Sequence, residues 1–433
     1  MRAATHHKLV DRVFRAVFFG VGGAVGSRVF MALANIILSR VLGQEVFGQY
    51  SSLSTTVNLF VTFSGMGISA TLTRYVAANS KDTEALGEYI RTLSWLCMGM
   101  AMLLTGVIAV FARQISVLST GGESLTVYFR GVALAVLFAA MSAVEQSILL
   151  GFERFAFGSL VQLIRCGVFC VLGYVLSIRY GLTGSVAALV VSHALQYGMM
   201  VLYNRVMIRK KRITLKFRWN HRTRLAMFTF ALPTFISGLF VLPVNWIGNA
   251  MLTQTAGFAQ VSVFAVASQW MTYITYIPSQ MGQMRPIYTD LYTRGKRQEL
   301  LKLMVRTMLI TSAIAVAIGA VVVAFSESIL GIYGSGYRDG QYTLAFMVLA
   351  AVLYTAQVQV GFLMQAAGKM WISFFSNVVW AVTLLSVYAV LIELEDRGYA
   401  IAYATAYVVT LVLQLLVVYR FLRKMSKESQ CDQ

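Results

Sequence analysis

The sequence predicts an all-α polytopic membrane protein, and its composition is the first reason. Of the 433 residues, 58% are hydrophobic and only 12% carry a charge, whereas soluble chains are about half apolar and about a quarter charged. The mean hydropathy is +0.70. The second reason is that the apolar residues gather in runs long enough to cross a bilayer. A soluble globular fold is therefore excluded.

Crossing the hydrocarbon core takes about 20 predominantly apolar residues, and the chain contains twelve such stretches. Six precede a basic run and six follow it, so we expect twelve transmembrane helices in two six-helix lobes. The expected domains are an N-terminal lobe over 1–204, a basic cytoplasmic linker over 205–224, and a C-terminal lobe with a short cytoplasmic tail over 225–433. The twelve stretches are roughly residues 17–40, 50–76, 90–111, 127–150, 156–177, 183–204, 225–252, 258–283, 302–325, 342–366, 371–392 and 399–421.

The basic run at 205–224 indicates how the chain is oriented. Nine of its residues are Lys or Arg, and none is Asp or Glu. The net charge of +19 would suggest nucleic-acid binding in a soluble domain, but in a membrane protein Lys and Arg concentrate in cytoplasmic loops. Loops and termini on one side hold 28 of the 36 Lys and Arg residues. We therefore expect both termini in the cytoplasm, contact of the basic run with membrane lipids, and no nucleic-acid partner.

Matching residues recur in the two halves at a nearly constant offset. Asn35 and Gly43 correspond to Asn249 and Gly257, each pair 214 residues apart. Duplicated six-span units of equal orientation are common in transporters. The sequence therefore favours an internal repeat.

Ionisable side chains at membrane depth are the first candidates for a functional site, because they are costly when they face lipid. On a helical wheel, Arg28 shares a face with small and polar residues that include Asn35, and branched apolar residues occupy the opposite face. Arg165 is a second candidate for binding a substrate. Glu145 is the one acid well inside a stretch and a candidate for ion coupling. The alternative for these two residues is a buried ion pair that only fixes helix packing.

The C-terminal half contains uncharged polar residues at helical spacing. Such stripes can hydrogen-bond between helices, or they can line a water-filled vestibule that binds a polyhydroxylated substrate. We favour the vestibule. The residues expected to line it are Asn245, Asn249, Gln269, Tyr273, Tyr276, Gln280 and Gln357.

Catalytic motifs are missing from the sequence. There is no Gly-rich phosphate loop with a Lys, no nucleophile elbow and no paired-His zinc motif. The sequence therefore predicts neither an enzyme nor a metal site, and no cofactor.

Short motifs resemble those of a known family. Leu42 to Tyr50 (LGQEVFGQY) is similar to the L-G-x-x-x-[FY]-G-x-Y pattern of bacterial polysaccharide repeat-unit flippases, within the multidrug, oligosaccharidyl-lipid and polysaccharide exporter superfamily. Further similar residues are Arg74-Tyr75, Gly151 to Phe155, Pro233 and Gly334 to Tyr337. The resemblance spans nearly the whole chain. It implies two six-helix lobes around a central cavity.

The function implied by the resemblance is that of a flippase in the bacterial inner membrane. It would move an undecaprenyl-pyrophosphate-linked oligosaccharide repeat unit from the cytoplasmic to the periplasmic leaflet by alternating access, and a glycan polymerase is a potential partner. Arg28, with or without Arg165, would attract the pyrophosphate, and the polar stripes would bind the sugars.

Three other functions are alternatives. A cation-coupled multidrug exporter of the same superfamily needs carboxylates at membrane depth, for which Glu145 is the candidate. Peptidoglycan-precursor flippases usually carry fourteen spans rather than twelve. A membrane glycan polymerase or ligase typically has a large outer loop, whereas the longest outer loops expected here, 112–126 and 326–341, are short.

Overall fold

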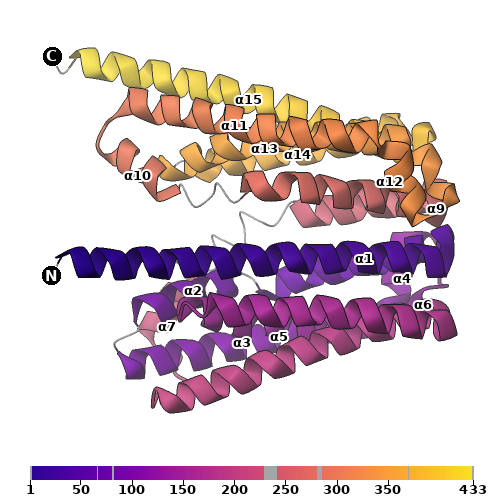
Figure 1. The fold of residues 1–433 in the computed structure, drawn as a ribbon, viewed down its shortest axis with the longest axis horizontal. Coiled ribbons are helices and arrows are strands. Elements are labelled where there is room, and N and C mark those ends of the chain that lie inside the picture. Colours follow the sequence, from indigo (N-terminus) through magenta and orange to yellow (C-terminus); the bar gives the residue numbers. More distant parts are fainter. Residues whose placement is uncertain are drawn as a thin grey trace. The chain divides into compact units, whose positions relative to one another are not determined.

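The fold is taken from a computed structural model that describes residues 2–65, 67–79, 82–228, 241–279, 285–368 and 370–431. Over these residues the chain forms helices joined by turns and one extended linker, and it contains no strand (Figure 1). In the described ranges, nine helices are long and apolar enough to cross a membrane. The predicted fold class, an all-α polytopic membrane protein, is confirmed.

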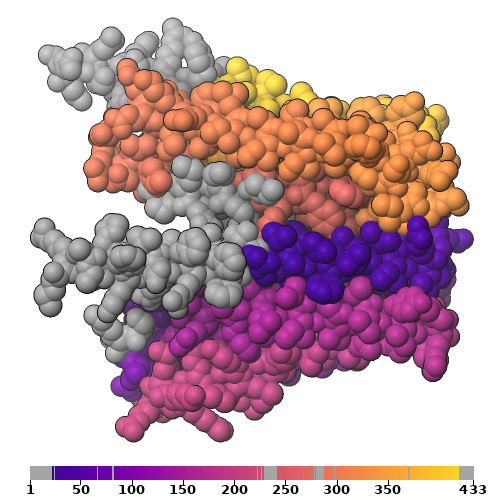
Figure 2. All heavy atoms as spheres, viewed as in Figure 1, coloured from indigo at the N-terminus to yellow at the C-terminus, as the bar shows by residue number. Residues whose placement is uncertain are grey.

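The chain divides into two compact units, Met1–Leu242 and Pro243–Gln433. In the first unit α1 packs along α6, and α5 lies against α1, α2, α3 and α6. The coloured atoms of α1 and those of α6 form one continuous surface in Figure 2. The helices of this unit are α1 (Arg2–Gly65), α2 (Ile68–Ala78), α3 (Thr83–Val110), α4 (Ala112–Thr120), α5 (Thr126–Gly151), α6 (Phe155–Lys210) and α7 (His221–Ala226).

In the second unit, α15 packs against α13 and α14, and α11 packs against α13. The helices of this unit are α9 (Val241–Ser279), α10 (Arg285–Thr293), α11 (Arg297–Ala324), α12 (Ser326–Tyr333), η3 (Ser335–Gly340), α13 (Gln341–Ala366), α14 (Met370–Val390), η4 (Ile392–Leu394) and α15 (Glu395–Cys431).

Three of the long helices contain a glycine with non-helical backbone angles. Gly43 divides α1 with φ 75° and ψ 169°, and Gly257 divides α9 with φ 83° and ψ 176°. Gly181 divides α6 with φ 54° and ψ −129°. Glycine populates positive φ without the steric cost that a Cβ brings. Each of these three helices therefore consists of two segments that meet at a kink, while the count of twelve spans stays a prediction.

The two units share backbone features at equivalent positions. Gly43 and Gly257 are 214 residues apart and share one backbone conformation. Gly181 and Glu395 are also 214 apart, and Glu395 has φ 53° and ψ −127°. Helices α4 and α12 each begin directly after a phenylalanine, Phe111 or Phe325, again 214 apart. These correspondences support the internal repeat that the sequence favours.

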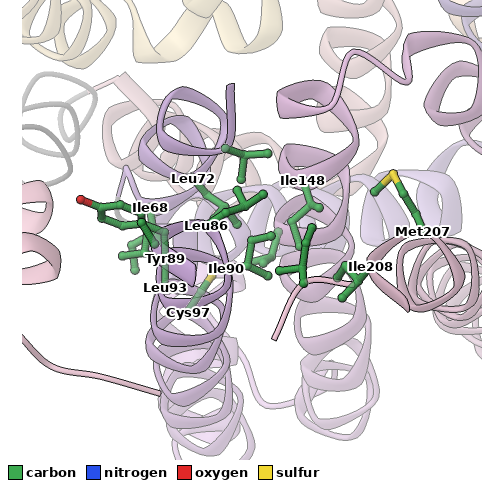
Figure 3. Packing of buried hydrophobic residues seen from close by; sticks show 14 residues of the cluster. Ile68, Leu72, Leu86, Tyr89, Ile90, Leu93, Cys97, Ile148, Met207 and Ile208 are labelled. Carbon is green, nitrogen blue, oxygen red and sulfur yellow. The ribbon is translucent and has the colours of Figure 1, made fainter. Parts of the chain in front are cut away.

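Much of the first unit is held together by one buried apolar cluster (Figure 3). It joins α2, α3, α5 and the end of α6, and residues such as Leu72, Leu86 and Leu93 are fully buried. Within a bilayer, helices associate through the van der Waals packing of such side chains. The cluster also includes Ile213, which lies beyond the last turn of α6.

Residues 213–220, which we call the linker strap, lie along α3. The backbone N–H of Arg218 donates to Thr92 Oγ1 (3.1 Å), whose hydroxyl donates to the Arg218 carbonyl (3.2 Å). The buried Glu88 carboxylate accepts from Arg218 Nη1 (3.0 Å) and from Asn220 Nδ2 (2.8 Å). Part of the basic run thus packs against α3 within the first unit rather than forming a free loop. The domain bounds inferred from the sequence stay a prediction.

Candidate functional site

Arg28 lies in the first segment of α1 and is half-buried, as is Asn35 two turns further on. This segment lies so close to α6 that a Cβ added at Gly23 would be only 2.5 Å from Ser159 Cβ. Val25, Val29 and Leu33, which the helical wheel places opposite Arg28, are exposed. An exposed branched apolar face suits contact with lipid.

Arg165 lies in the first segment of α6 and is only 9% exposed. Its Nη2 donates to Cys166 Sγ at 3.2 Å, and its Nε has no hydrogen-bond partner. The ion pairs formed between described residues do not include Arg165. The sequence left open a buried ion pair between Arg165 and Glu145 that would fix helix packing. The structure of the described residues does not contain this ion pair.

Glu145 lies on α5, where Asn204 of α6 holds it. Asn204 Nδ2 donates to Glu145 Oε2 at 2.7 Å and to the Glu145 carbonyl at 3.0 Å. Both residues line a cavity of about 310 Å³ between α3, α5 and α6. Arg91, Trp95 and Arg205 also line it, and the Arg91 guanidinium lies 5.1 Å from the Trp95 ring centre. Glu145 therefore has a polar partner and an open space, which an ion-coupling residue requires.

Polar side chains gather around Arg165 inside the first unit. Tyr50 of α1 stacks on Phe169, one turn after Arg165, with ring centres 6.3 Å apart. One turn before Arg165, Gln162 accepts a hydrogen bond from Gln196 Nε2 at 2.9 Å. The sequence assigned no function to Tyr50 or the glutamines, because only tertiary packing brings them beside Arg165.

In the second unit, the predicted vestibule residues lie on α9 and α13. Asn245 Oδ1 accepts from the Tyr403 hydroxyl, and Gln269 Nε2 donates to the Tyr273 hydroxyl. Asn249 is buried and Tyr276 is half-buried. Gln357 is buried, and its Oε1 has no hydrogen-bond partner. Gln280 lies outside the described residues.

An aromatic column on α15 was missed in the sequence. Tyr399, Tyr403 and Tyr407 follow one another at intervals of four residues, and consecutive rings are 5.2 Å and 6.3 Å apart. Tyr399 packs against Phe264 of α9 with tilted rings, and Tyr407 contacts Tyr354 of α13. The interval of four, with small residues between, is the signal that predicts one helical face. The column positions Asn245 through its contact with Tyr403.

Among the described residues, no cluster of three or more His, Cys, Asp or Glu side chains could hold a metal ion.

Two curated relatives are similar over most of their length. The chain is 25% identical over 375 residues to the EPS I polysaccharide export inner membrane protein EpsE of Ralstonia nicotianae, covering 85% of this chain and 84% of the relative. The protein of the same name from Ralstonia solanacearum is 23% identical over 410 residues, covering 93% and 92%.

Solved structures show the same fold at low sequence identity. An inward-facing multidrug resistance MATE family transporter of the MOP superfamily matches with a TM-score of 0.80 at 17% identity, covering 92% of this chain and 96% of the transporter. The lipid II flippase MurJ in an inward closed conformation matches with a TM-score of 0.74 at 13% identity, covering 93% and 87%. The chain therefore shares the fold of these two transporters.

Residues 13–287 match the family described as "Polysaccharide biosynthesis protein". The two relatives are named as polysaccharide export proteins, and with the family match this confirms the prediction of a membrane transport protein rather than an enzyme. Because the match covers more than half of the chain, the protein belongs to the Polysaccharide biosynthesis protein family.

Proposed function

We propose that this multi-pass inner membrane protein is a flippase for lipid-linked oligosaccharide repeat units. It would move an undecaprenyl-pyrophosphate-linked oligosaccharide from the cytoplasmic to the periplasmic leaflet by alternating access, with both termini in the cytoplasm. A glycan polymerase that consumes the flipped units is the expected partner. The family assignment and the polysaccharide export relatives support this substrate class.

The observation that carries the proposal is the positive charge of the first unit at membrane depth. Arg165 is buried and forms no ion pair with a described residue, and Arg28 is half-buried on the helix packed against it. Ionised side chains at this depth are costly unless they serve a polar pathway or a ligand. A diphosphate headgroup carries the opposite charge. In this proposal Arg28 and Arg165 attract that headgroup.

The second unit would bind the oligosaccharide. Asn245, Asn249, Gln269, Tyr273, Tyr276 and Gln357 supply amide and phenol groups at membrane depth, and Gln280 remains a candidate by sequence alone. Amides both donate and accept hydrogen bonds, as sugar hydroxyls do. The unpartnered Oε1 of Gln357 supports a role in binding a hydroxyl group.

The membrane potential can drive this movement. Carrying about two negative charges outward across roughly 100 mV, inside negative, releases about 4–5 kcal/mol. A coupling ion is then not required for transport, and Glu145 remains a candidate for one because it lines a cavity of about 310 Å³.

A cation-coupled multidrug exporter is the alternative that the MATE fold itself raises. Export of organic cations requires accessible carboxylates at membrane depth, and Glu145 already accepts a hydrogen bond from Asn204. Efflux of an organic cation from everted vesicles is required by this alternative and not by the flippase proposal.

The charge of Arg28 provides the test in cells. We expect Arg28→Ala to reduce glycan export and Arg28→Glu to abolish it, since the second change repels a diphosphate, while Arg28→Lys keeps part of the activity. Protein abundance in the membrane serves as the control. Unchanged export in both Arg28→Ala and Arg28→Glu would mean that the headgroup is not recognised here.

A further inference from the structure

The cavity beside Glu145 lies near the ends of the helices that form it. Arg91 is eight residues after the start of α3, Glu145 six residues before the end of α5, and Arg205 five residues before the end of α6. At 1.5 Å per residue these positions are about 8–12 Å from the helix ends. Trp95 beside the cavity and Trp219 of the linker strap are each 45% exposed. Because tryptophan is enriched at membrane interfaces, the cavity lies at the level of the lipid headgroups.

The buried wall of this cavity presents oxygen atoms that lack a hydrogen-bond donor. Asn204 is 1% exposed, and its Nδ2 donates to Glu145 Oε2 at 2.7 Å and to the Glu145 carbonyl at 3.0 Å. Asn204 Oδ1 is left without a partner, as is the buried Ser94 Oγ on the facing helix α3. Unsatisfied buried polar atoms are uncommon in native proteins. A water molecule could bond to these oxygens, but it brings no charge to the carboxylate. A cationic N–H donor supplies both.

The exposed rim of the cavity carries two cations. Arg91 and Arg205 both line it, and neither forms an ion pair with a described residue. The acids of α3 pair with Lys216 and Arg218 of the linker strap instead. The Arg91 guanidinium lies 5.1 Å from the ring centre of Trp95, a cation–π contact that orients it. Guanidinium groups bind phosphate oxygens through paired hydrogen bonds, so the rim suits a phosphate.

The remaining lining is apolar and well supported. Ile90, Ile148 and Ile208 line the cavity and belong to the buried cluster of the first unit (Figure 3). The volume of about 310 Å³ is at the small end of the range for ligand pockets, about 300–1,000 Å³. The matching ligand therefore has a phosphate, a cationic N–H donor close to it, and apolar chains.

We propose that this cavity binds the headgroup of phosphatidylethanolamine, a phospholipid of the surrounding bilayer. The phosphate contacts Arg91 and Arg205, and the ammonium donates to Glu145 and to Asn204 Oδ1. Phosphatidylcholine fits less well because its quaternary nitrogen has no N–H, and phosphatidylglycerol fits less well because its headgroup has no cation. The bound lipid would connect α3, α5 and α6. This site gives Glu145 a function other than ion coupling, and it does not rest on the proposed transport of oligosaccharides.

The thermal stability of the purified full-length protein tests the site. The protein is exchanged into lipid-free dodecyl maltoside and titrated with dioleoyl phosphatidylethanolamine, phosphatidylcholine or phosphatidylglycerol, which differ only in their headgroups. We expect phosphatidylethanolamine to raise the Tm in a saturable way, because a ligand stabilises the state that binds it, and the other two lipids to have much weaker effects. Native mass spectrometry should find one retained phosphatidylethanolamine per protein.

Two variants remove the two ends of the site. Glu145→Gln should weaken binding of phosphatidylethanolamine about tenfold or more, since it removes a hydrogen bond to a charged group. The double variant Arg91→Gln/Arg205→Gln should do the same through the phosphate. Glu45→Gln and Arg179→Gln are the matched controls, because both residues are exposed in the same unit and neither lines the cavity. The readout is the dependence of the Tm on lipid, so a variant of lower basal stability still answers the question.

Three results would overturn the proposal. The first is equal stabilisation by phosphatidylcholine, which would mean that the lipid acts through its chains alone. The second is an unchanged dependence on phosphatidylethanolamine in both the Glu145 variant and the double arginine variant. The third is a saturable effect of Na⁺ in the absence of lipid that Glu145→Gln removes, without any preference for phosphatidylethanolamine. That result would make the cavity a site for a coupling cation.

Discussion

Replacing Glu395 with glycine should stabilise the protein. Glu395 has φ 53° and ψ −127° between η4 and α15, and Gly181, at the corresponding position 214 residues earlier, has φ 54° and ψ −129°. A residue with a Cβ in such a conformation costs about 1–3 kcal/mol. Glycine relieves this strain but increases the entropy of the unfolded chain by about 0.5–1 kcal/mol. The expected net gain is about 1 kcal/mol.

The side chain of Glu395 does not offset this gain, because it is exposed at the first turn of α15. An acidic residue near a helix N-terminus contributes about 0.3–1 kcal/mol, and Asp396 in the same turn remains. The strain therefore exceeds what the Glu395 carboxylate supplies.

Thermal unfolding in detergent measures the effect. Glu395→Gly should raise the Tm, and the reverse change, Gly181→Glu, should lower it. Glu393→Gly is the matched control, because Glu393 is an exposed acid two residues earlier without positive φ, and its replacement should not raise the Tm. A lower Tm for Glu395→Gly would show that the two turns are not equivalent.

Two further predictions concern the linker strap and a buried hydrogen bond. Gly87→Ala would place a Cβ 2.0 Å from the Thr214 carbonyl oxygen. The linker strap should therefore detach, and trypsin should cleave at Lys216 or Arg218 faster than in the wild type. Gly99→Ala on the same helix is the control, because its Cβ meets nothing within 4 Å and should not change the rate of cleavage. Thr343→Val removes the hydroxyl that donates to the buried Asp396 carboxylate at 2.5 Å. The expected loss is about 1–3 kcal/mol, visible as a lower Tm, and Thr343→Ser should restore most of it.

The helices were predictable from the sequence where hydrophobic length decides them. The predicted stretches 90–111 and 127–150 end within one residue of α3 and α5, and 342–366 matches α13. Length alone did not reveal α4 and α12, because these helices are too short to span a bilayer. The sequence predicted that Gly43 and Gly257 correspond, because both positions carry glycine. It did not predict that Gly181 corresponds to Glu395, because the second unit carries glutamate where the first carries glycine.

The candidate site was less predictable, because side-chain partners come from distant parts of the chain. Helical periodicity indicated which face of α1 carries Arg28, but it could not decide whether Arg165 pairs with Glu145. In the structure, Glu145 accepts a hydrogen bond from Asn204, which is 59 residues away in sequence. The structure also stacks Tyr50 of α1 on Phe169, one turn after Arg165. The contacts of the linker strap with Glu88 and Thr92 could not be predicted from the sequence either. Positive charge is typical of any cytoplasmic loop and does not indicate which residues the loop contacts.

Movement of a lipid-linked oligosaccharide between leaflets is the most direct measurement of the central claim. The purified protein is reconstituted into liposomes with a fluorescent, diphosphate-linked oligosaccharide, and a potential is imposed in either direction. We expect protein-dependent movement without change in glycan length, faster when the potential drives negative charge toward the receiving leaflet, and lost in Arg28→Glu. Movement equal to that in protein-free liposomes, together with efflux of an organic cation, would contradict the proposal.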